Sequence, residues 1–141
     1  MPYNVYLDTN ILLDYILDNR PAHHSAVAVM EACRDNIVNG WVSAQSFCDA
    51  FYIMRKDFNP RERKQFLQSI CVFLEIVAVD ELKIEEALTD DNFVDMEDCV
   101  QYLCAQAAEV NFIITNNLRD FKHSDIPVLS PDAFVRQYLP A

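Results

Sequence analysis

The stretch YNVYLDTNILLDYI, residues 3–16, passes from one apolar segment to another through three polar residues, Asp8, Thr9 and Asn10. Its first half is typical of a short buried strand, and its second half carries helix-forming residues. Almost no loop separates the two. Asp, Thr and Asn are common helix caps, so helix capping explains these residues as well as ligand binding does. The pattern predicts a strand that passes directly into a helix.

Length and composition favour a single domain, 1–141, without a membrane segment. With 52% hydrophobic residues, a chain of this size would bury roughly two-thirds of the surface that its unfolded form exposes. No apolar run approaches the roughly 20 residues that cross a bilayer, and no signal-peptide pattern opens the sequence. We therefore expect a soluble protein that remains in the cytoplasm.

The five cysteines are expected to be reduced thiols in the core. They are odd in number, lie among apolar neighbours and include no C-x-x-C pair. They are Cys33, Cys48, Cys71, Cys99 and Cys104. Reduced cysteines agree with a cytoplasmic location.

Charge and glycine content exclude two kinds of binding protein. The net charge of -11 argues against a protein that holds nucleic acid by a basic surface alone, because phosphate binding rests on Lys and Arg. An RNA or DNA partner would need metal ions or a local basic patch. The single glycine, Gly40, excludes glycine-rich phosphate loops and dinucleotide-binding fingerprints, which need several glycines at fixed spacing.

Strands and helices alternate along the rest of the chain. Apolar runs predict strands at 3–7, 41–43, 75–79, 111–115 and 127–130, with Gly40 marking the turn before the second. Helices are expected at 10–17, 23–36, 43–56, 61–74, 82–88, 97–110 and 131–139. This alternation predicts a three-layer α/β/α sandwich around a parallel sheet of about five strands, covered by helices on both faces.

Four aspartates fall where such a sheet collects its ligands, outside the carboxyl ends of the strands. Asp8 ends the first predicted strand, and Asp49 lies on the third predicted helix. Asp98 begins the helix before the fourth strand, and Asp120 follows that strand. Converging carboxylates repel one another, so we expect a hard divalent cation, Mg2+ or Mn2+, among them. Such an ion can activate water for attack on phosphorus, which favours phosphodiester hydrolysis.

Four segments of the chain resemble the signature segments of the PIN-domain family. In order, they are YLDTNILLD, VSAQSFCDAFYIMRK, DMEDCVQYLCAQAAEV and FIITNNLRDF. The resemblance covers essentially the whole chain and implies an α/β/α sandwich around a parallel sheet. It also implies a metal-dependent ribonuclease similar to VapC-type toxins, a homodimer, and an antitoxin protein as partner.

The resemblance assigns roles to individual residues. Asp8, Asp49 and Asp98 match the family's first three acidic positions and would hold the metal, with a water activated by it as the nucleophile. Thr9 and Asn10 match the polar pair after the first acid. These two residues would cap the helix and orient the carboxylate.

Two positions depart from the family pattern. The second acid is most often glutamate in the family, and Asp49 is one methylene shorter. Thr115 matches the threonine that closes the fourth strand, but Asn117 stands two residues later, where many members have the fourth acid. Either Asp120 or Asn117 would then complete the site.

Simpler structural roles remain open for two of the acids. Asp49 could be a solvated residue on an exposed helical stripe. Asp98 could be a first-turn acid favoured by the helix dipole, with Asp95 as the N-cap in a capping-box arrangement with it. Asp95 and Glu97 rank below Asp98 as metal ligands.

Basic residues cluster around one predicted turn. Five of the eleven basic residues lie there: Arg55, Lys56, Arg61, Arg63 and Lys64. In the simpler interpretation, the first two lie at a helix C-terminus and the others on a solvent-facing helix surface. In the alternative, this whole cluster, with Arg119 and Lys122, forms a rim that guides RNA to the acids. The residues named as possible RNA ligands are Arg55, Lys56, Arg119 and Lys122.

The leading hypothesis is a Mg2+- or Mn2+-dependent ribonuclease, and the toxin role follows only from the resemblance. The main alternative is a catalytically weakened PIN fold that serves as a binding or regulatory module, because Asn117 replaces an acid. A third hypothesis is an aspartyl-phosphate phosphatase with Asp8 as nucleophile. It is disfavoured because such enzymes usually carry a second Asp two residues on, where this chain has Asn10.

Overall fold

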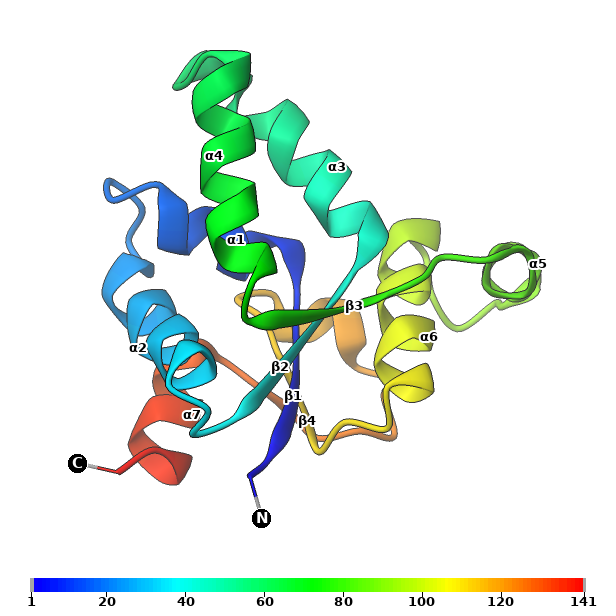
Figure 1. Ribbon diagram of the computed structural model, residues 1–141. Helices are drawn as coiled ribbons and strands as arrows, with labels where there is room; N and C mark the ends of the chain where they lie inside the picture. Colours follow the sequence, from blue (N-terminus) through cyan, green and yellow to red (C-terminus); the bar gives the residue numbers. More distant parts are fainter. Residues whose placement is uncertain (1, 141) are drawn as a thin grey trace.

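A five-stranded parallel sheet lies at the centre of the computed structural model, which describes residues 2–140 (Figure 1). The strands are β1 (Asn4–Leu7), β2 (Asn39–Ser43), β3 (Leu74–Val77), β4 (Phe112–Ile114) and β5 (Val128–Leu129). Their order is β3-β2-β1-β4-β5, and all neighbouring pairs are parallel. The chain builds outward from β1 in both directions, so the strand order reverses between β1 and β4. Ligand crevices of parallel sheets lie at such a reversal.

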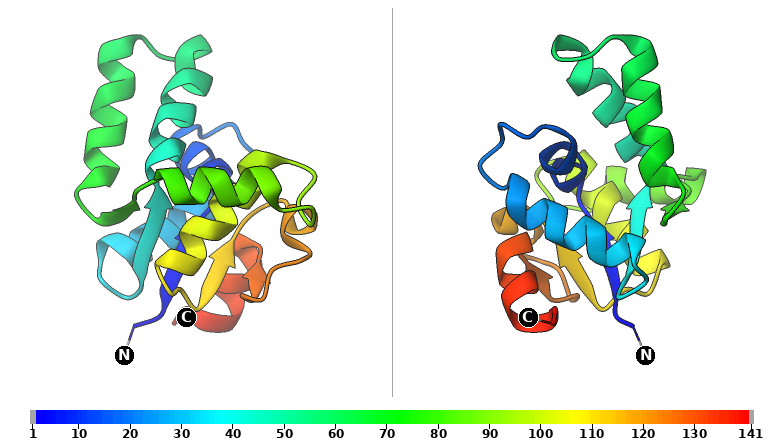
Figure 2. Two further views of the ribbon diagram at one scale, coloured as in Figure 1. Left: turned by 90° about the vertical axis from the view of Figure 1, so that its right-hand side faces the viewer. Right: turned by 60° about the vertical axis from the view of Figure 1, so that its left-hand side comes forward.

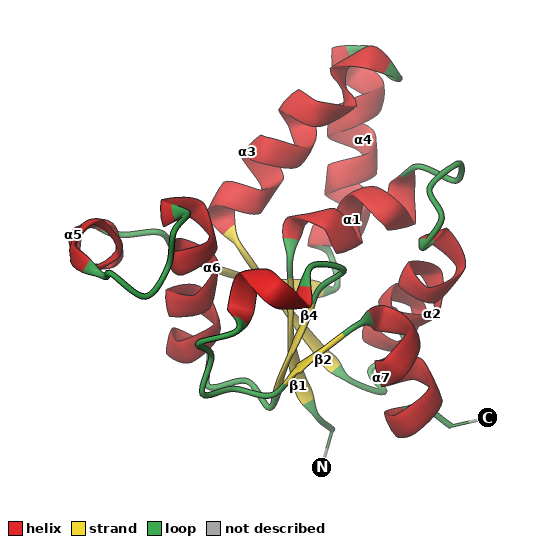
Figure 3. Ribbon diagram, turned by 180° about the vertical axis from the view of Figure 1, so that it is seen from behind, coloured by secondary structure: helices red, strands yellow, loops and turns green. Residues whose placement is uncertain are grey.

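Helices cover both faces of the sheet. They are α1 (Thr9–Ile16), α2 (His23–Arg34), α3 (Ala44–Ile53), α4 (Pro60–Cys71), α5 (Glu81–Thr89), α6 (Met96–Ala107) and α7 (Pro131–Tyr138), with short 3-10 helices η1 (Met54–Lys56) and η2 (Leu118–Phe121). Figure 3 shows α1, α2 and α7 on one side of the strands and α5 and α6 on the other. The helices α3 and α4 form a pair that extends beyond the sheet (Figure 2). Within residues 2–140, no helix has the length and apolar character to cross a membrane.

The central strand β1 is buried on both faces. Val5 and Leu7 belong to the core beneath α1, α2 and α7, whereas Tyr6 belongs to the core beneath α5 and α6. All three side chains are fully buried. Successive strand residues point to opposite faces, so burial of all three requires a helix layer on each side. The three-layer α/β/α architecture predicted from the sequence is confirmed.

Two local predictions were wrong. The helix predicted at 61–74 ends at Cys71, and Leu74 begins β3. Gly40 lies inside β2 rather than in a turn before it. A Cβ atom at Gly40 would lie 2.7 Å from Cys33 Sγ and 2.7 Å from a Leu74 methyl carbon, so glycine gives α2 and β3 room to pack there.

The cysteine prediction was partly right. Among the described residues all five thiols are free, and Cys33, Cys99 and Cys104 are buried. Cys48 and Cys71 are exposed, so the expectation that all five are core residues was wrong for these two. Both lie on the α3–α4 pair, which contacts the core with one side only.

Candidate active site

Asp8 lies at the junction of β1 and α1 and is 8% exposed. Its Oδ1 accepts a hydrogen bond from the Thr9 backbone N–H at 2.8 Å, so Asp8 itself caps α1. Its Oδ2 accepts from Thr115 Oγ1 at 2.8 Å and from Asn10 Nδ2 at 3.3 Å. Three donors therefore hold one carboxylate. Thr9 and Asn10 were expected to cap the helix, but Asp8 is the cap. The hydrogen bonds predicted from Thr9 and Asn10 to the Asp8 carboxylate are present.

The electrostatic environment of Asp8 favours the neutral acid. Burial raises the pKa of Asp8 above its ordinary value, and the hydrogen bonds from Thr115 and Thr9 oppose this effect. The nearby charge of Asp120 raises the pKa further. Burial and the neighbouring acid therefore outweigh the three hydrogen-bond donors in setting the pKa of Asp8.

Asp49 lies on α3 and is half-buried. Gln45, one turn earlier, donates from Nε2 to Asp49 Oδ1 at 2.9 Å. Asp49 Oδ2 is buried and has no hydrogen-bond partner within residues 2–140. The interpretation of Asp49 as a solvated surface residue does not fit this environment, because a buried carboxylate oxygen normally meets a donor or a cation.

Asp98 lies in the first turn of α6 and is half-buried. Burial raises the pKa of Asp98 to about 7, and the carboxylates of Asp120, Asp95 and Asp8 add to the shift. Asp8 and Asp120 are distant from Asp98 in the sequence, so the fold brings these two acids near it. Asp95 is the N-cap of α6 as predicted, but its Oδ1 accepts from the Glu97 N–H at 2.9 Å rather than forming a capping box with Asp98.

Glu97, which ranks below Asp98 as a predicted ligand, lies close to Asp49. Burial raises the pKa of Glu97, and the carboxylate of Asp49 is the next largest cause. Glu97 and Asp49 also line a common cavity of about 410 Å³ between α3 and α6. The acidic surroundings of Asp49 therefore include Glu97, one residue before Asp98.

Asp120, rather than Asn117, is the fourth polar candidate whose charge acts on the other acids. Asp120 lies in η2, and its carboxylate raises the pKa of both Asp8 and Asp98. It lines a cavity of about 350 Å³ together with Asp98. Asn117 is exposed, and its backbone N–H donates to Thr115 Oγ1 at 3.0 Å. Asn117 thus supports the threonine that holds Asp8.

None of these acids forms an ion pair with a basic side chain of residues 2–140. The ion pairs within residues 2–140 involve other carboxylates: Asp14, Asp35, Asp80 and Asp132. As the side chains lie, no three His, Cys, Asp or Glu residues of the described chain form a set that could hold a metal ion. A metal would be held only after the acids turn toward one another. The donor set, all carboxylate oxygens with one buried oxygen unpartnered, fits a hard divalent cation.

The predicted basic residues fall into two groups. Arg119 and Lys122 are exposed and line the cavity that contains Asp98. Arg55 and Lys56 are exposed on η1, beyond the far end of α3. The first group therefore lies beside the acids, whereas the second lies along the α3–α4 pair.

Arg63 has a structural role that the sequence analysis missed. It was expected on a solvent-facing surface of the helix, but it is only 9% exposed. Its Nη1 donates to the Phe51 carbonyl oxygen at 2.8 Å, and its guanidinium lies 4.2 Å from the centre of the Phe51 ring. These contacts join α4 to α3.

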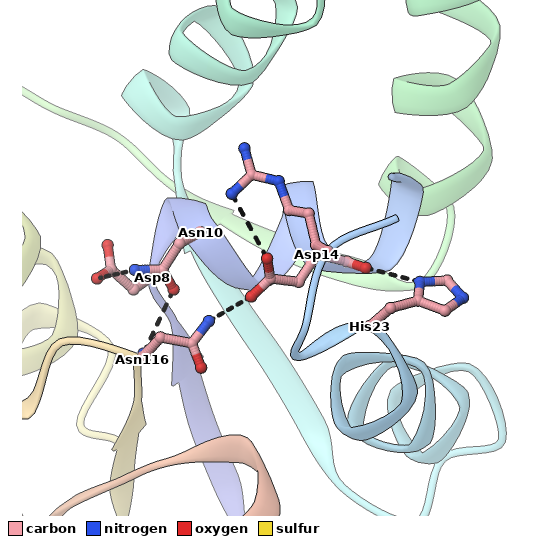
Figure 4. A network of polar contacts seen from close by, with 6 residues as sticks. Asp8, Asn10, Asp14, His23 and Asn116 are labelled. Atoms are coloured by element: carbon pink, nitrogen blue, oxygen red, sulfur yellow. Dashed lines mark hydrogen bonds and ion pairs between the residues drawn. The ribbon is translucent and has the colours of Figure 1, made fainter. Parts of the chain in front are cut away.

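A second polar network, which the sequence analysis also missed, flanks Asp8 (Figure 4). Asp14, only 3% exposed, accepts a hydrogen bond from Asn116 Nδ2 and pairs with Arg20 at 3.5 Å. The Asn116 backbone N–H lies 3.5 Å from Asn10 Oδ1, and Asn10 bonds to Asp8. A lone acid within the apolar sequence of α1 is the signal that could have identified Asp14.

Comparison with known proteins finds relatives over most of the chain. A family model described as PIN domain matches residues 4–119. The chain is 24% identical over 138 residues to Ribonuclease VapC1 of Aquifex aeolicus (strain VF5), covering 95% of this chain and 94% of that protein.

Solved structures share the fold at low sequence identity. DNA-bound VapBC from Salmonella typhimurium matches with a TM-score of 0.68 and 19% identity, over 92% of this chain and 98% of that chain. VapC20 from Mycobacterium tuberculosis, described as a toxin that cleaves the sarcin-ricin loop, matches with a TM-score of 0.62 and 9% identity, over 77% of this chain and 86% of that chain.

Proposed function

Because the chain belongs to the PIN-domain family, we propose that it is a divalent-metal-dependent ribonuclease. Its centre is the acidic cluster: Asp8, Asp49, Asp98 and Asp120. One observation carries the proposal. At the strand-order reversal, the carboxylate of Asp120 raises the pKa of both Asp8 and Asp98, and none of the four acids forms an ion pair within residues 2–140. Carboxylate oxygens are the ligands that Mg2+ and Mn2+ prefer.

Asp8, Asp49 and Asp98 would hold the ion. A bound Mg2+ or Mn2+ would polarise the phosphodiester and lower the pKa of a water molecule. The three donors on Asp8 keep its carboxylate in one orientation. The unpartnered Oδ2 of Asp49 is available as a ligand. Asp120, on the η2 side of the cluster, would complete the site and accept a proton from the attacking water.

RNA would approach over the basic residues nearest the acids. Arg119 and Lys122 line the same cavity as two members of the acidic cluster, so they would bind phosphates close to the cleaved bond. Arg55 and Lys56 would bind the same strand farther away, beyond α3. Contacts of this kind position a backbone without selecting its sequence.

A toxin role with an antitoxin partner extends the proposal. One structural relative is described as a toxin, and another solved relative as a toxin-antitoxin complex. By this likeness the chain would form a homodimer and would be inhibited by a small protein that occupies the cleft. A short reading frame immediately upstream, encoding a protein with a DNA-binding amino end that co-purifies with this chain, would support the role.

Cleavage of structured RNA by the purified chain, with and without Mn2+, tests the enzymatic proposal. We expect Mn2+-dependent products with the wild type and none with Asp8→Asn. Asp132→Asn is the matched control, because Asp132 is exposed on α7 and, among residues 2–140, its one ion-pair partner is Arg136. Cleavage that persists without metal or in Asp8→Asn would contradict the proposal. RNA binding without any cleavage would favour the binding-module alternative.

A further inference from the structure

Beneath the acidic cluster, buried polar side chains connect the elements that carry its acids. Ser46 Oγ lies 2.7 Å from Thr9 Oγ1 and 3.0 Å from Ser43 Oγ. Gln101 donates from Nε2 to Ser46 Oγ at 3.3 Å and accepts at Oε1 from the Tyr6 hydroxyl. We call this group the serine hub: Tyr6, Thr9, Ser43, Ser46 and Gln101. It joins β1, β2, α1, α3 and α6.

The hydrogen-bonding capacity of Ser46 is fully used. A serine hydroxyl has one donor and two acceptor positions, and Ser46 has three side-chain partners. Ser46 is fully buried, and Gln101 is 1% exposed. Burial raises the pKa of Tyr6 well above its ordinary value, so its phenol stays neutral and can donate. A fully satisfied buried network is rigid and specifies one arrangement.

Apart from β2, each element joined at Ser46 has one acid close to its hub residue. Thr9 directly follows an acid. Ser46 on α3 and Gln101 on α6 are each three residues away from an acid of their own helix, so each lies on the same helix face as that acid. The pairs are Asp8 with Thr9, Asp49 with Ser46, and Asp98 with Gln101. The beginnings of α3 and α6 lie side by side above the sheet (Figure 1), as the Gln101 to Ser46 hydrogen bond requires.

We propose that the serine hub sets the spacing of the metal-binding acids. Ser46 is fully buried and contacts no solvent, so it is a positioning residue and not a ligand. By fixing α3 and α6 relative to β1, it holds the carboxylates of Asp49 and Asp98 within reach of Asp8. This inference rests on the proposed function, because it concerns the same metal site.

Mn2+ binding by isothermal titration calorimetry tests the proposal without relying on activity. In Ser46→Ala, Thr9 and Gln101 lose a buried partner, and the helices lose their common contact. We expect the Mn2+ dissociation constant to rise about tenfold, as for other supporting residues around metal sites. A residue with only a structural role would lower the midpoint of unfolding and leave Mn2+ affinity of the folded protein unchanged.

Two control variants separate positioning from general loss of stability. Val29→Ala removes fully buried methyl groups on α2, in the core on the other face of the sheet, and should lower stability while leaving the Mn2+ dissociation constant unchanged. Ser69→Ala makes the same chemical change as Ser46→Ala at an exposed serine, which bonds only to the Phe66 carbonyl oxygen. It should change neither property.

Gln101→Met provides a second test if Ser46→Ala does not fold. Methionine keeps the length of the side chain and removes both hydrogen bonds. We expect a similar tenfold rise in the Mn2+ dissociation constant. Because Ser46 and Gln101 act through one contact, the double variant should lose less affinity than the product of the two single changes.

The outcomes distinguish this inference from the proposed function. If the wild type binds Mn2+, Asp8→Asn does not, and folded Ser46→Ala or Gln101→Met binds about tenfold more weakly, both stand. If the hub variants bind Mn2+ as the wild type does, the hub inference alone is overturned. If the wild type binds no Mn2+, both are overturned.

Discussion

The hydrogen bond from Thr115 to Asp8 gives a prediction whose size depends on pH. Thr115 is fully buried at the end of β4, and its Oγ1 donates to Asp8 Oδ2 at 2.8 Å. In Thr115→Val, a methyl group of similar size replaces the hydroxyl. Asp8 then loses one of its three donors while it remains buried. The cost should fall on the ionised form of Asp8, because a carboxylate needs the donor more than a neutral acid does.

The magnitude follows from the charge on the acceptor. A hydrogen bond to a charged group contributes about 1.5–3 kcal/mol, and one between neutral groups contributes about 1 kcal/mol. We therefore expect Thr115→Val to lower the free energy of unfolding by about 2 kcal/mol near pH 8, where more of Asp8 is ionised. The loss should decrease toward about 1 kcal/mol as the pH is lowered and Asp8 takes up its proton, because the acceptor then becomes neutral.

The sign of this pH dependence follows from the raised pKa of Asp8. Burial raises the pKa of Asp8 above its unfolded value, so the folded state favours the protonated acid. The stability contributed by protonation is present below the unfolded pKa and is lost as pH rises through the folded pKa. The Thr115 bond opposes the shift, so its removal raises the pKa of Asp8 further and enlarges the loss at high pH.

Urea unfolding at several pH values, followed by circular dichroism, measures this effect. Thr89→Val is the matched control, because its Oγ1 bonds to the Glu85 and Glu86 carbonyl oxygens on the exposed surface of α5. The control should show a small loss of stability that does not change with pH. A Thr115→Val loss that is constant, or that grows toward acid pH, would refute the reasoning.

Three further predictions concern the metal, the packing and RNA binding. Burial raises the pKa of Asp98 to about 7, and a bound ion must displace its proton. The Mn2+ affinity, measured by calorimetry, should therefore fall by up to about tenfold for each pH unit below that value. Gly40→Ala should cost about 1–3 kcal/mol in urea unfolding, because its Cβ would lie 2.7 Å from Cys33 Sγ. Arg119→Ala and Lys122→Ala should raise KM for RNA more than they lower kcat, and they should weaken the salt dependence of cleavage. A change in kcat alone would contradict their proposed role.

The junction of β1 and α1 was predictable because its signals are local. An apolar strand, a capping residue and an apolar helix follow one another within the stretch 3–16, and each signal depends on near neighbours only. The alternation of strands and helices was predictable for the same reason. It identified a parallel sheet with both faces covered, and with it the end of the sheet where Asp8 and Asp98 lie.

The supporting residues were not predictable because their partners are distant in the sequence. Ser46 bonds to Thr9 and Gln101, which lie 37 and 55 residues away. Asp14 bonds to Asn116 across 102 residues. Helical periodicity shows which face a polar residue occupies, but it does not show that another polar residue will meet it there. Hydrogen-bond partners therefore became visible only in the fold.

Ion pairing distinguishes the proposed metal ligands from the other buried acids better than the depth of burial does. Asp14 is more deeply buried than Asp8, but the chain neutralises it with Arg20. Asp8, Asp49 and Asp98 have donors or neighbouring acids but no cationic partner among residues 2–140. A buried carboxylate without a cation must take up a proton or bind a cation from solution, because an isolated charge is too costly to bury. Buried acids that the chain leaves unpaired, unlike the neutralised Asp14, are therefore available to an external ion.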